Sequence, residues 1–148
     1  MIIFKEINNE NISEVLNLKV SDLQKDYIES MEKSLDDAKN NAYGIKWTPI
    51  GIYYENLLIG FAMYGLNSEN HLWIDRFLID YPYQNKGYGK KTLNQLIKYL
   101  KEKYSKSKYF CLSVSEKNEI AINLYKEFGF NFTGDLDGND PVMSLVMN

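Results

Sequence analysis

The residues of this chain best suited to chemistry lie in a short segment rich in glycine and lysine. It spans 84–91 and reads Gln-Asn-Lys-Gly-Tyr-Gly-Lys-Lys, between an apolar stretch and a helical pattern. Glycines allow backbone N–H groups to turn toward a ligand, and the start of a helix attracts negative charge. Lys86, Lys90 and Lys91 add positive charge. The segment therefore indicates a site for a phosphate-type anion, with a plain glycine turn before a helix as the alternative.

Spacing excludes two other anion-binding loops. A P-loop requires Gly-Lys followed by Ser or Thr, whereas Gly89-Lys90 is followed by Lys91. A dinucleotide fingerprint with glycines at Gly87 and Gly89 requires a third glycine three residues later, where Thr92 stands. The segment is therefore neither a Walker loop nor a Rossmann loop.

Cysteine and histidine each occur once, as Cys111 and His71. An intrachain disulfide, a thiolate metal cluster and a multi-histidine zinc site are therefore excluded for this chain alone, and we expect no metal. Cys111 lies between Phe110 and Leu112 with no histidine nearby in the sequence to activate it. We interpret it as a small buried hydrophobic residue rather than a nucleophile.

Length and composition are those of one globular domain, spanning 1–148. The 17 Lys and Arg against 20 Asp and Glu give a net charge of −3, which argues weakly against a nucleic-acid partner and is compatible with a cationic substrate. The start of the chain is charged early and no long apolar run follows. We therefore expect neither a signal peptide nor a membrane segment, and a cytoplasmic location.

Hydrophobic periodicity predicts the elements that must position the anion segment. Strands are expected at 2–7, 50–54, 57–64, 72–80, 109–114, 130–134 and 142–146, the last two joined by a turn at 135–140. Helices are expected at 12–23, from about Ser34 as N-cap through 38, at 89–104 and at 119–128. This order predicts an α/β fold with a mixed sheet, in which the strands flanking the two later helices run parallel or splay apart.

Two motifs on these elements resemble the GNAT family of N-acetyltransferases. Residues 84–89 match Gln/Arg-x-x-Gly-x-Gly/Ala placed after a strand. Residues 118–130, Asn-Glu-Ile-Ala-Ile-Asn-Leu-Tyr-Lys-Glu-Phe-Gly-Phe, resemble the family's Asn-x-x-Ala-x-x-Leu-Tyr-x-x-x-Gly-Phe helix. The motifs occur in the family's order, and the resemblance covers essentially the whole chain.

This resemblance implies a GNAT fold, a mixed and mostly antiparallel sheet of about seven strands flanked by about four helices. The fourth and fifth strands splay, and the pantetheine arm of acetyl-CoA lies in the gap between them. The residues that the resemblance implies for acetyl-CoA are Phe77, Leu78, Ile79, Gln84, Asn85, Lys86, Gly87, Tyr88, Gly89, Lys90, Asn118, Ala121 and Tyr125. The family's dimers suggest a homodimer by analogy alone.

Tyr125 matches the family's usual general acid beside the thioester sulfur. Acyl transfer to an amine also needs a polarised carbonyl and a neutral amine, and a free backbone N–H of Leu78 or Ile79 could supply the polarisation. No specific base stands out among His71, Asp75, Asp80 and Glu29. Direct transfer is expected, without an acetylated Cys111.

The acceptor is predicted from a narrower resemblance. The segments 26–30 and 34–38, with 60–65 and the Trp-Ile-Asp-Arg-Phe pattern at 73–77, resemble small bacterial spermidine/spermine acetyltransferases. We therefore expect a polyamine held by carboxylates and aromatic rings, with Trp73 and Asp75 on one strand face with Phe77 and Ile79. The residues expected to bind the substrate are Tyr27, Glu29, Asp36, Trp73 and Asp75.

Other acceptors and one other class of protein stay open. A protein N-terminus, a lysine or an aminoglycoside could each be the acceptor. A domain that binds acetyl-CoA as a sensor without catalysis is the alternative from outside the enzymes, and the presence of Tyr125 argues against it.

Overall fold

The structure is a computed structural model that describes residues 1–19 and 30–147. The strands of this part of the chain form one seven-stranded sheet in the order β1-β2-β3-β4-β5-β7-β6. The β4–β5 pair is parallel and the other neighbouring pairs are antiparallel, which confirms the predicted mixed sheet. The strands are β1 (Ile2–Glu6), β2 (Thr48–Tyr54), β3 (Leu57–Leu66), β4 (Leu72–Ile79), β5 (Tyr109–Ser113), β6 (Asn131–Asp137) and β7 (Asp140–Val146).

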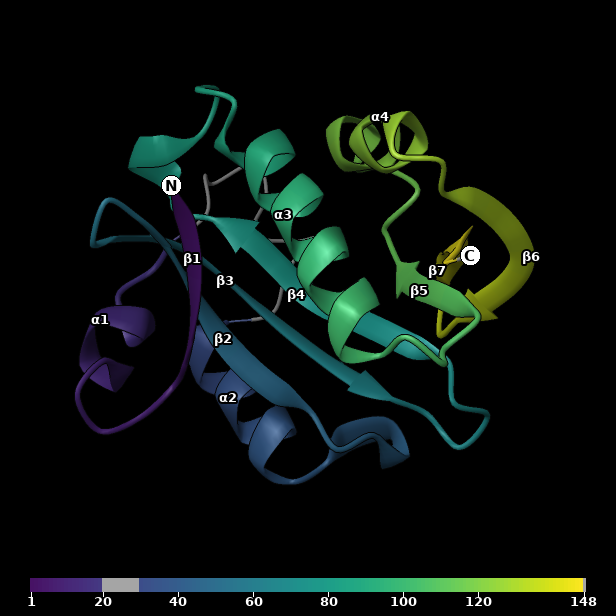
Figure 1. Cartoon of the computed structure of the whole chain (residues 1–148), viewed down its shortest axis with the longest axis horizontal. Helices are drawn as coiled ribbons and strands as arrows, with labels where there is room; N and C mark the ends of the chain where they lie inside the picture. Colours follow the sequence, from purple (N-terminus) through teal and green to yellow (C-terminus); the bar gives the residue numbers. More distant parts are fainter. Residues whose placement is uncertain (20–29, 148) are drawn as a thin grey trace.

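Helices cover both faces of the sheet (Figure 1). Helix α3 crosses one face and α4 lies beside β5, whereas α1 and α2 lie on the opposite face. The helices of the described residues are α1 (Ile12–Leu16), α2 (Met31–Lys39), α3 (Tyr88–Lys103) and α4 (Glu119–Glu127), with short 3₁₀ turns η2 (Ala42–Gly44) and η3 (Tyr81–Tyr83). None of these helices is long and apolar enough to cross a membrane.

Strand β3 shows how the sequence builds two cores. Ile59, Ala62 and Tyr64 belong to the core under α3 and α4, while Phe61 and Met63 belong to the core under α1 and α2. All five side chains are buried. Residues 61–64 alternate between the two covered faces, whereas the irregular pairing of β2 with β3 puts Ile59 and Phe61 in different cores although they are two residues apart. The sheet therefore separates two hydrophobic cores, one on each of its faces.

Helix α3 forms where its apolar stripe predicts it. Leu93, Leu96, Ile97 and Leu100 are buried at helical spacing, and lysines occupy the exposed side. Burial of each such side chain contributes about 1.5–3 kcal/mol. The packing of this stripe against the sheet fixes where the helix begins, and so where the anion segment lies.

The start of α2 differs from the sequence prediction. Ser34 was expected to cap the helix, but it lies inside α2 and is buried. Ser30 is the cap, because its backbone is extended and its Oγ accepts a hydrogen bond from the N–H of Lys33 at 3.1 Å. The predicted helix at 12–23 also ends early, at Leu16, and its residues 20–23 lie outside the described part of the chain.

Candidate functional site

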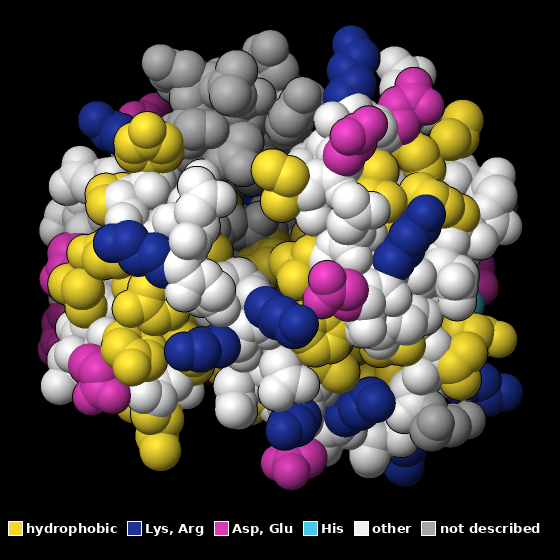
Figure 2. All heavy atoms as spheres, turned by 90° about the horizontal axis from the view of Figure 1, so that it is seen from above, with side chains coloured by type: hydrophobic (Ala, Val, Ile, Leu, Met, Phe, Trp, Pro, Cys, Tyr) yellow, Lys and Arg dark blue, Asp and Glu magenta, His cyan; other side chains and the backbone are white. Residues whose placement is uncertain are grey.

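The site begins where β4 and β5 part. Leu72 pairs with Phe110 and Trp73 with Cys111, and the described pairing of the two strands ends there. From Ile74 onward β4 therefore presents its backbone to a gap, as expected for the fourth and fifth strands. Figure 2, seen from the end of the molecule at which α3 begins, shows a hollow with hydrophobic side chains on its floor and positively charged side chains beside it.

The glycine-rich segment leads from η3 into the first turn of α3. Gly87 has a left-handed backbone with φ of 84°, and nothing lies within 4 Å of where its Cβ would be. Asn85 is also left-handed, with φ of 61°, and Gln84 Nε2 donates a hydrogen bond to the Ile79 carbonyl oxygen at 2.8 Å. The backbone at the start of α3 is therefore open to a ligand, at the end of the helix that favours an anion.

Two of the lysines predicted at this segment differ in what they contact. Lys86 is exposed. Lys90 forms an ion pair with Glu127 of α4, with 3.1 Å between Nζ and Oε2, and both side chains are more than half exposed. An exposed pair of this kind contributes little and leaves the lysine able to turn toward an anion. Tyr88, by contrast, is an aromatic packing residue, with its ring centroid 5.1 Å from that of Tyr54.

Helix α4 brings Tyr125 to the gap. Its ring is buried against Phe130, with 5.8 Å between centroids, and its hydroxyl has no hydrogen-bond partner among residues 1–19 and 30–147. Burial raises the pKa of Tyr125, and the negative charge of Asp75 raises it further. The hydroxyl is therefore protonated at neutral pH and able to donate a hydrogen bond, and it is near enough to β4 to be influenced by the charge of Asp75.

Asn118 has a structural role that the motif did not indicate. Its Oδ1 accepts a hydrogen bond from the N–H of Ala121 at 3.3 Å, so Asn118 caps α4. Both residues are half-buried at the start of the helix. The Asn-x-x-Ala part of the motif therefore fixes the helix that carries Tyr125.

A β-bulge interrupts β4 at Arg76. Leu78 pairs with Phe61 and Asp75 with Met63, so Arg76 and Phe77 together oppose the single residue between those two partners. Arg76 has a left-handed backbone, with φ of 56°. The extra residue shifts the alternation of side chains for the rest of the strand.

The bulge makes one sequence prediction wrong. Trp73 and Asp75 were expected to share a face with Phe77 and Ile79. Trp73 packs against the core under α1 and α2, whereas Phe77 packs against the core under α3 and α4. Ile79 also faces α3, since its Cγ1 lies 3.9 Å from where a Cβ on Gly89 would be.

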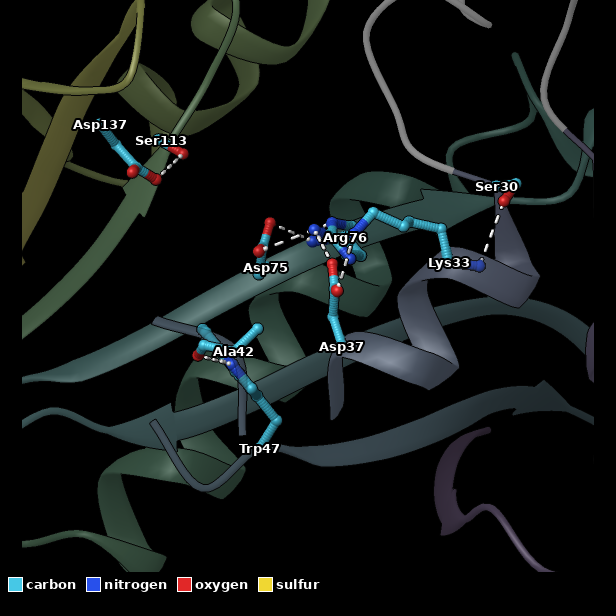
Figure 3. Close-up of polar contacts among 9 residues, drawn as sticks. All are labelled: Ser30, Lys33, Asp37, Ala42, Trp47, Asp75, Arg76, Ser113 and Asp137. Atoms are coloured by element: carbon cyan, nitrogen blue, oxygen red, sulfur yellow. Dashed lines mark hydrogen bonds and ion pairs between the residues drawn. The ribbon is translucent and has the colours of Figure 1, made fainter. Parts of the chain in front are cut away.

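Asp75, Arg76 and Asp37 form a buried charged cluster between β4 and α2 (Figure 3). Arg76 Nη2 donates to Asp37 Oδ2 at 2.9 Å, and Arg76 Nε lies 3.6 Å from Asp75 Oδ2. Asp75 Oδ1 accepts a hydrogen bond from the backbone N–H of Arg76 at 2.8 Å. Burial raises the pKa of Asp75, and the positive charge of Arg76 opposes that shift. Desolvation opposes ionisation of Asp37 too, but hydrogen bonds from Lys33 and Arg76 hold the pKa of Asp37 below its usual value.

The cluster contains two residues that sequence reasoning missed, Arg76 and Asp37. Arg76 was visible only as part of the Trp-Ile-Asp-Arg-Phe pattern. Asp37 adjoins Asp36, and the two acids cannot be told apart without the position of α2. Asp36 is exposed and lines a groove of about 540 Å³ with Glu32, Leu35 and Lys39, and neither Asp37 nor Arg76 lines that groove.

The remaining predicted substrate residues divide into two groups. Trp73 lies beside the point where the strands part, and its Nε1 is buried without a hydrogen-bond partner among the described residues. Tyr27 and Glu29 lie outside the described residues. The structure therefore places Trp73 and Asp75 on β4, with Asp75 near enough to Tyr125 for its charge to raise the pKa of the phenol, and it places Asp36 on α2.

Cys111 and His71 lie at the closed end of the gap or beyond it. Cys111 is buried, and burial raises the pKa of its thiol to about 11, so the thiol is protonated at neutral pH. The His71 ring packs edge-on against Tyr109, with 5.1 Å between centroids. Neither position suggests a nucleophile or a base at the gap.

The arrangement combines an anion-binding helix start, a gap beside an unpaired strand, a phenol that can donate and a carboxylate with an adjacent guanidinium. Such a set can hold a phosphorylated ligand, place its extended arm against β4 and assist the departure of a leaving group near Tyr125. The carboxylate is suited to a cationic partner on the opposite side of the gap.

Comparison with known proteins finds acetyltransferases among the relatives of this chain. A family model described as "Acetyltransferase (GNAT) family" matches residues 12–130. The chain is 47% identical over 142 residues to the spermine/spermidine N(1)-acetyltransferase of Bacillus subtilis strain 168, a match that covers 91% of each chain.

Solved structures share the fold at low identity. A spermidine N-acetyltransferase from Vibrio cholerae, in complex with CoA and spermine, gives a TM-score of 0.75 at 17% identity and covers 99% of this chain and 95% of its own. The ribosomal-protein-S18-alanine N-acetyltransferase from Escherichia coli gives 0.73 at 18% identity, covering 100% and 95%. Likeness of fold therefore does not distinguish a polyamine from a protein N-terminus as acceptor.

Proposed function

Since this chain belongs to the GNAT family of acetyltransferases, we propose that it transfers the acetyl group of acetyl-CoA to a primary amine of spermidine or spermine. The observation that carries the choice of acceptor is the 47% identity to the Bacillus subtilis spermine/spermidine N(1)-acetyltransferase, over 91% of both chains. The charged and aromatic residues beside the gap support a cationic acceptor.

The site residues fit acetyl-CoA. The left-handed Gly87 and the open space at its Cβ position allow the backbone to approach a pyrophosphate. Lys86 and Lys90, which flank Gly87 in the sequence, can neutralise the charge of the pyrophosphate. The unpaired edge of β4 can hydrogen-bond the amide groups of the pantetheine arm. When bound, acetyl-CoA supplies the thioester carbonyl carbon and a thiolate leaving group.

Tyr125 is suited to stabilise that leaving group. The ordinary pKa values of a phenol, about 10, and of a thiol, about 8.5, make full proton transfer to the sulfur uphill by roughly 2 kcal/mol. The raised pKa of Tyr125 increases the free-energy cost of this proton transfer further. Tyr125 therefore donates a hydrogen bond to the developing thiolate, and complete proton transfer comes late.

The acceptor nitrogen must lose a proton before it can attack. An alkyl amine with a pKa of about 10.4 is neutral in about one molecule in a few thousand at pH 7, a deficit of about 4.6 kcal/mol. Asp75 is the carboxylate beside the gap, with its side chain 29% exposed. We assign to Asp75 the binding of the ammonium and the first uptake of its proton, directly or through water.

A linear polycation offers little shape to recognise. Selection must therefore come from carboxylates that match its charge spacing and from aromatic rings that contact its methylenes and ammonium groups. Asp75 and Trp73 can supply these contacts at the reacting end of the molecule. Tyr27, Glu29 and Asp36 are the proposed contacts for the rest of it.

Steady-state kinetics with an amine panel tests the function. With a free-thiol readout, we expect turnover of spermine and spermidine, weaker turnover of a diamine and no measurable turnover of a monoamine of similar bulk. Asp75→Asn should raise KM for spermidine. Equal use of the monoamine or of a peptide amine would overturn the polyamine assignment, whereas an absence of CoA release with every amine would overturn acetyl transfer itself.

A further inference from the structure

Arg76 is a buried cation at the centre of a proposed cation-binding site. Its side chain is 6% exposed, and it lies between a carboxylate on its own strand and one on α2 (Figure 3). A positive charge beside a site for a polyamine would repel the substrate unless it served another group there. The two carboxylates differ in a way that indicates which group that is.

Asp37 is fully engaged by the protein. Its Oδ1 lies 3.0 Å from Lys33 Nζ, its Oδ2 accepts from Arg76 at 2.9 Å, and its side chain is 10% exposed. Asp75 retains access, with a side chain that is 29% exposed and one oxygen only loosely paired, at 3.6 Å from Arg76 Nε. Asp37 therefore anchors Arg76, and Asp75 is the carboxylate left for a ligand.

The backbone also ties Asp75 to Arg76. A left-handed conformation costs a residue other than glycine about 1–2 kcal/mol, and Arg76 adopts it with φ of 56°. In this conformation its N–H reaches Asp75 Oδ1 at 2.8 Å. The bulge thus aims one oxygen of Asp75 at the strand and leaves the other beside the guanidinium.

Asp75 interacts electrostatically with groups on three other elements. Burial raises the pKa of Asp75, Arg76 lowers it, and the charges of Asp137 on β6 and Asp37 on α2 raise it. Tyr125 on α4 is near enough for the charge of Asp75 to raise the pKa of the phenol. Both influences that lower the pKa of Asp75 therefore come from Arg76, the charge of its guanidinium first and the hydrogen bond from its backbone N–H second.

We propose that Arg76, anchored by Asp37, is a positioning residue that keeps the Asp75 carboxylate ionised and oriented to receive the acceptor ammonium. This inference rests on the proposed function, since it assigns a task to a residue of the same site. An ionised Asp75 can bind an ammonium, and a protonated one cannot. The guanidinium thus allows the partly buried carboxylate of Asp75 to bind an ammonium group at neutral pH.

Removal of the guanidinium should move the acid limb of the pH profile. An opposite charge at this distance lowers a carboxyl pKa by about 1–3 units, so its loss raises the pKa of Asp75. The acid limb of kcat/KM for spermidine should then shift upward by about one pH unit or more. Arg76→Lys, which keeps the charge but not the planar group, should leave the limb near its wild-type position and raise KM.

Arg76→Gly is the variant of choice, because glycine adopts the left-handed conformation without strain and keeps the N–H that Asp75 accepts from. The double variant Asp37→Asn/Arg76→Gly also removes the charge of Asp37, so that Asp37 does not remain as a second carboxylate without its arginine if the single variant unfolds. Lys98→Gln, on the exposed side of α3, is the control for the loss of one positive charge.

Two readouts decide the matter. A carbon-13 NMR titration of the Asp75 carboxyl in the free protein should show the same upward shift as the kinetic limb, and Lys98→Gln should show neither. Coincident acid limbs and titrations in wild type and folded Arg76→Gly would overturn the inference, as would a uniform loss of rate at every pH. Because the titration needs no acceptor, it stands even if spermidine proves not to be the substrate.

Discussion

Tyr125 is a residue whose hydroxyl can be tested apart from its ring. Tyr125→Phe keeps the packing against Phe130 and removes only the donor, so we expect an unchanged fold and a fall in kcat of about 10²–10⁴-fold. Steady-state kinetics with saturating amine and acetyl-CoA measures this. Because the pKa of Tyr125 is raised, its ionisation should not contribute to the profile around neutral pH.

Cys111→Ala is the matched control for Tyr125→Phe. The thiol is buried and protonated, so its loss should leave turnover largely intact. A Tyr125→Phe variant with near wild-type kcat would return Tyr125 to a packing role. Detection of an acetylated Cys111 by mass spectrometry would replace direct transfer with a two-step route.

At the scale of single residues, the sequence indicated Tyr125, Asp75 and Trp73 but not their partners. The reason is physical. Left-handed backbone usually occurs at glycine or asparagine, so an arginine at φ of 56° leaves no mark in the sequence. Asp37 was hidden by Asp36, because which of two adjacent acids faces the sheet depends on where α2 begins, and that start was misplaced at Ser34 rather than Ser30.

At the scale of elements, the start of α3 carries the cofactor prediction. A Cβ on Gly89 would meet Ile79 and Leu124 at 3.9 Å, an ordinary contact, so the fold should tolerate a side chain there. Gly89→Val should nevertheless weaken CoA binding, because its branched side chain fills the space above the first turn. Calorimetric titration with CoA tests this, with thermal unfolding as a check of the fold.

Gly89→Ala is the graded control for that experiment. We expect its affinity for CoA to fall between those of wild type and Gly89→Val. Unchanged affinity in a folded Gly89→Val would remove the anion site from the start of α3. Gly87 is less informative, since its φ of 84° makes any substitution strained regardless of a ligand.

Elements with strong periodicity were predictable, and those set by local distortions were not. The stripe on α3 gave that helix to within one residue at each end. The bulge in β4 reversed the faces of Phe77 and Ile79 relative to Trp73 and Asp75, because one extra residue shifts an alternation of period two. The closing turn is also shorter than expected, since β6 continues to Asp137 and β7 begins at Asp140.

At the scale of the whole molecule, acceptor recognition should be cumulative. Exposed ion pairs contribute about 0.2–1 kcal/mol each and are screened by salt. KM for spermidine should therefore rise with ionic strength, and more steeply for spermine, which carries one more charge. The kcat with both substrates saturating is the reference, because the exposed lysines at the start of α3 should make the KM for acetyl-CoA depend on salt as well. A KM for spermidine that is independent of salt would exclude recognition through exposed carboxylates.

The parting of β4 and β5 has a mechanical consequence. Two residue pairs, Leu72–Phe110 and Trp73–Cys111, are the backbone ladder between a half-sheet of β1 to β4 and a half-sheet of β5 to β7. The protein therefore has a seam along its middle, closed at one end and open at the other. A molecule that lies in the open end and bonds to β4 takes the place of the missing rungs. With the proposed placement of acetyl-CoA, the pantetheine arm would complete the sheet that holds it, and release of CoA would separate the two half-sheets again at each turnover.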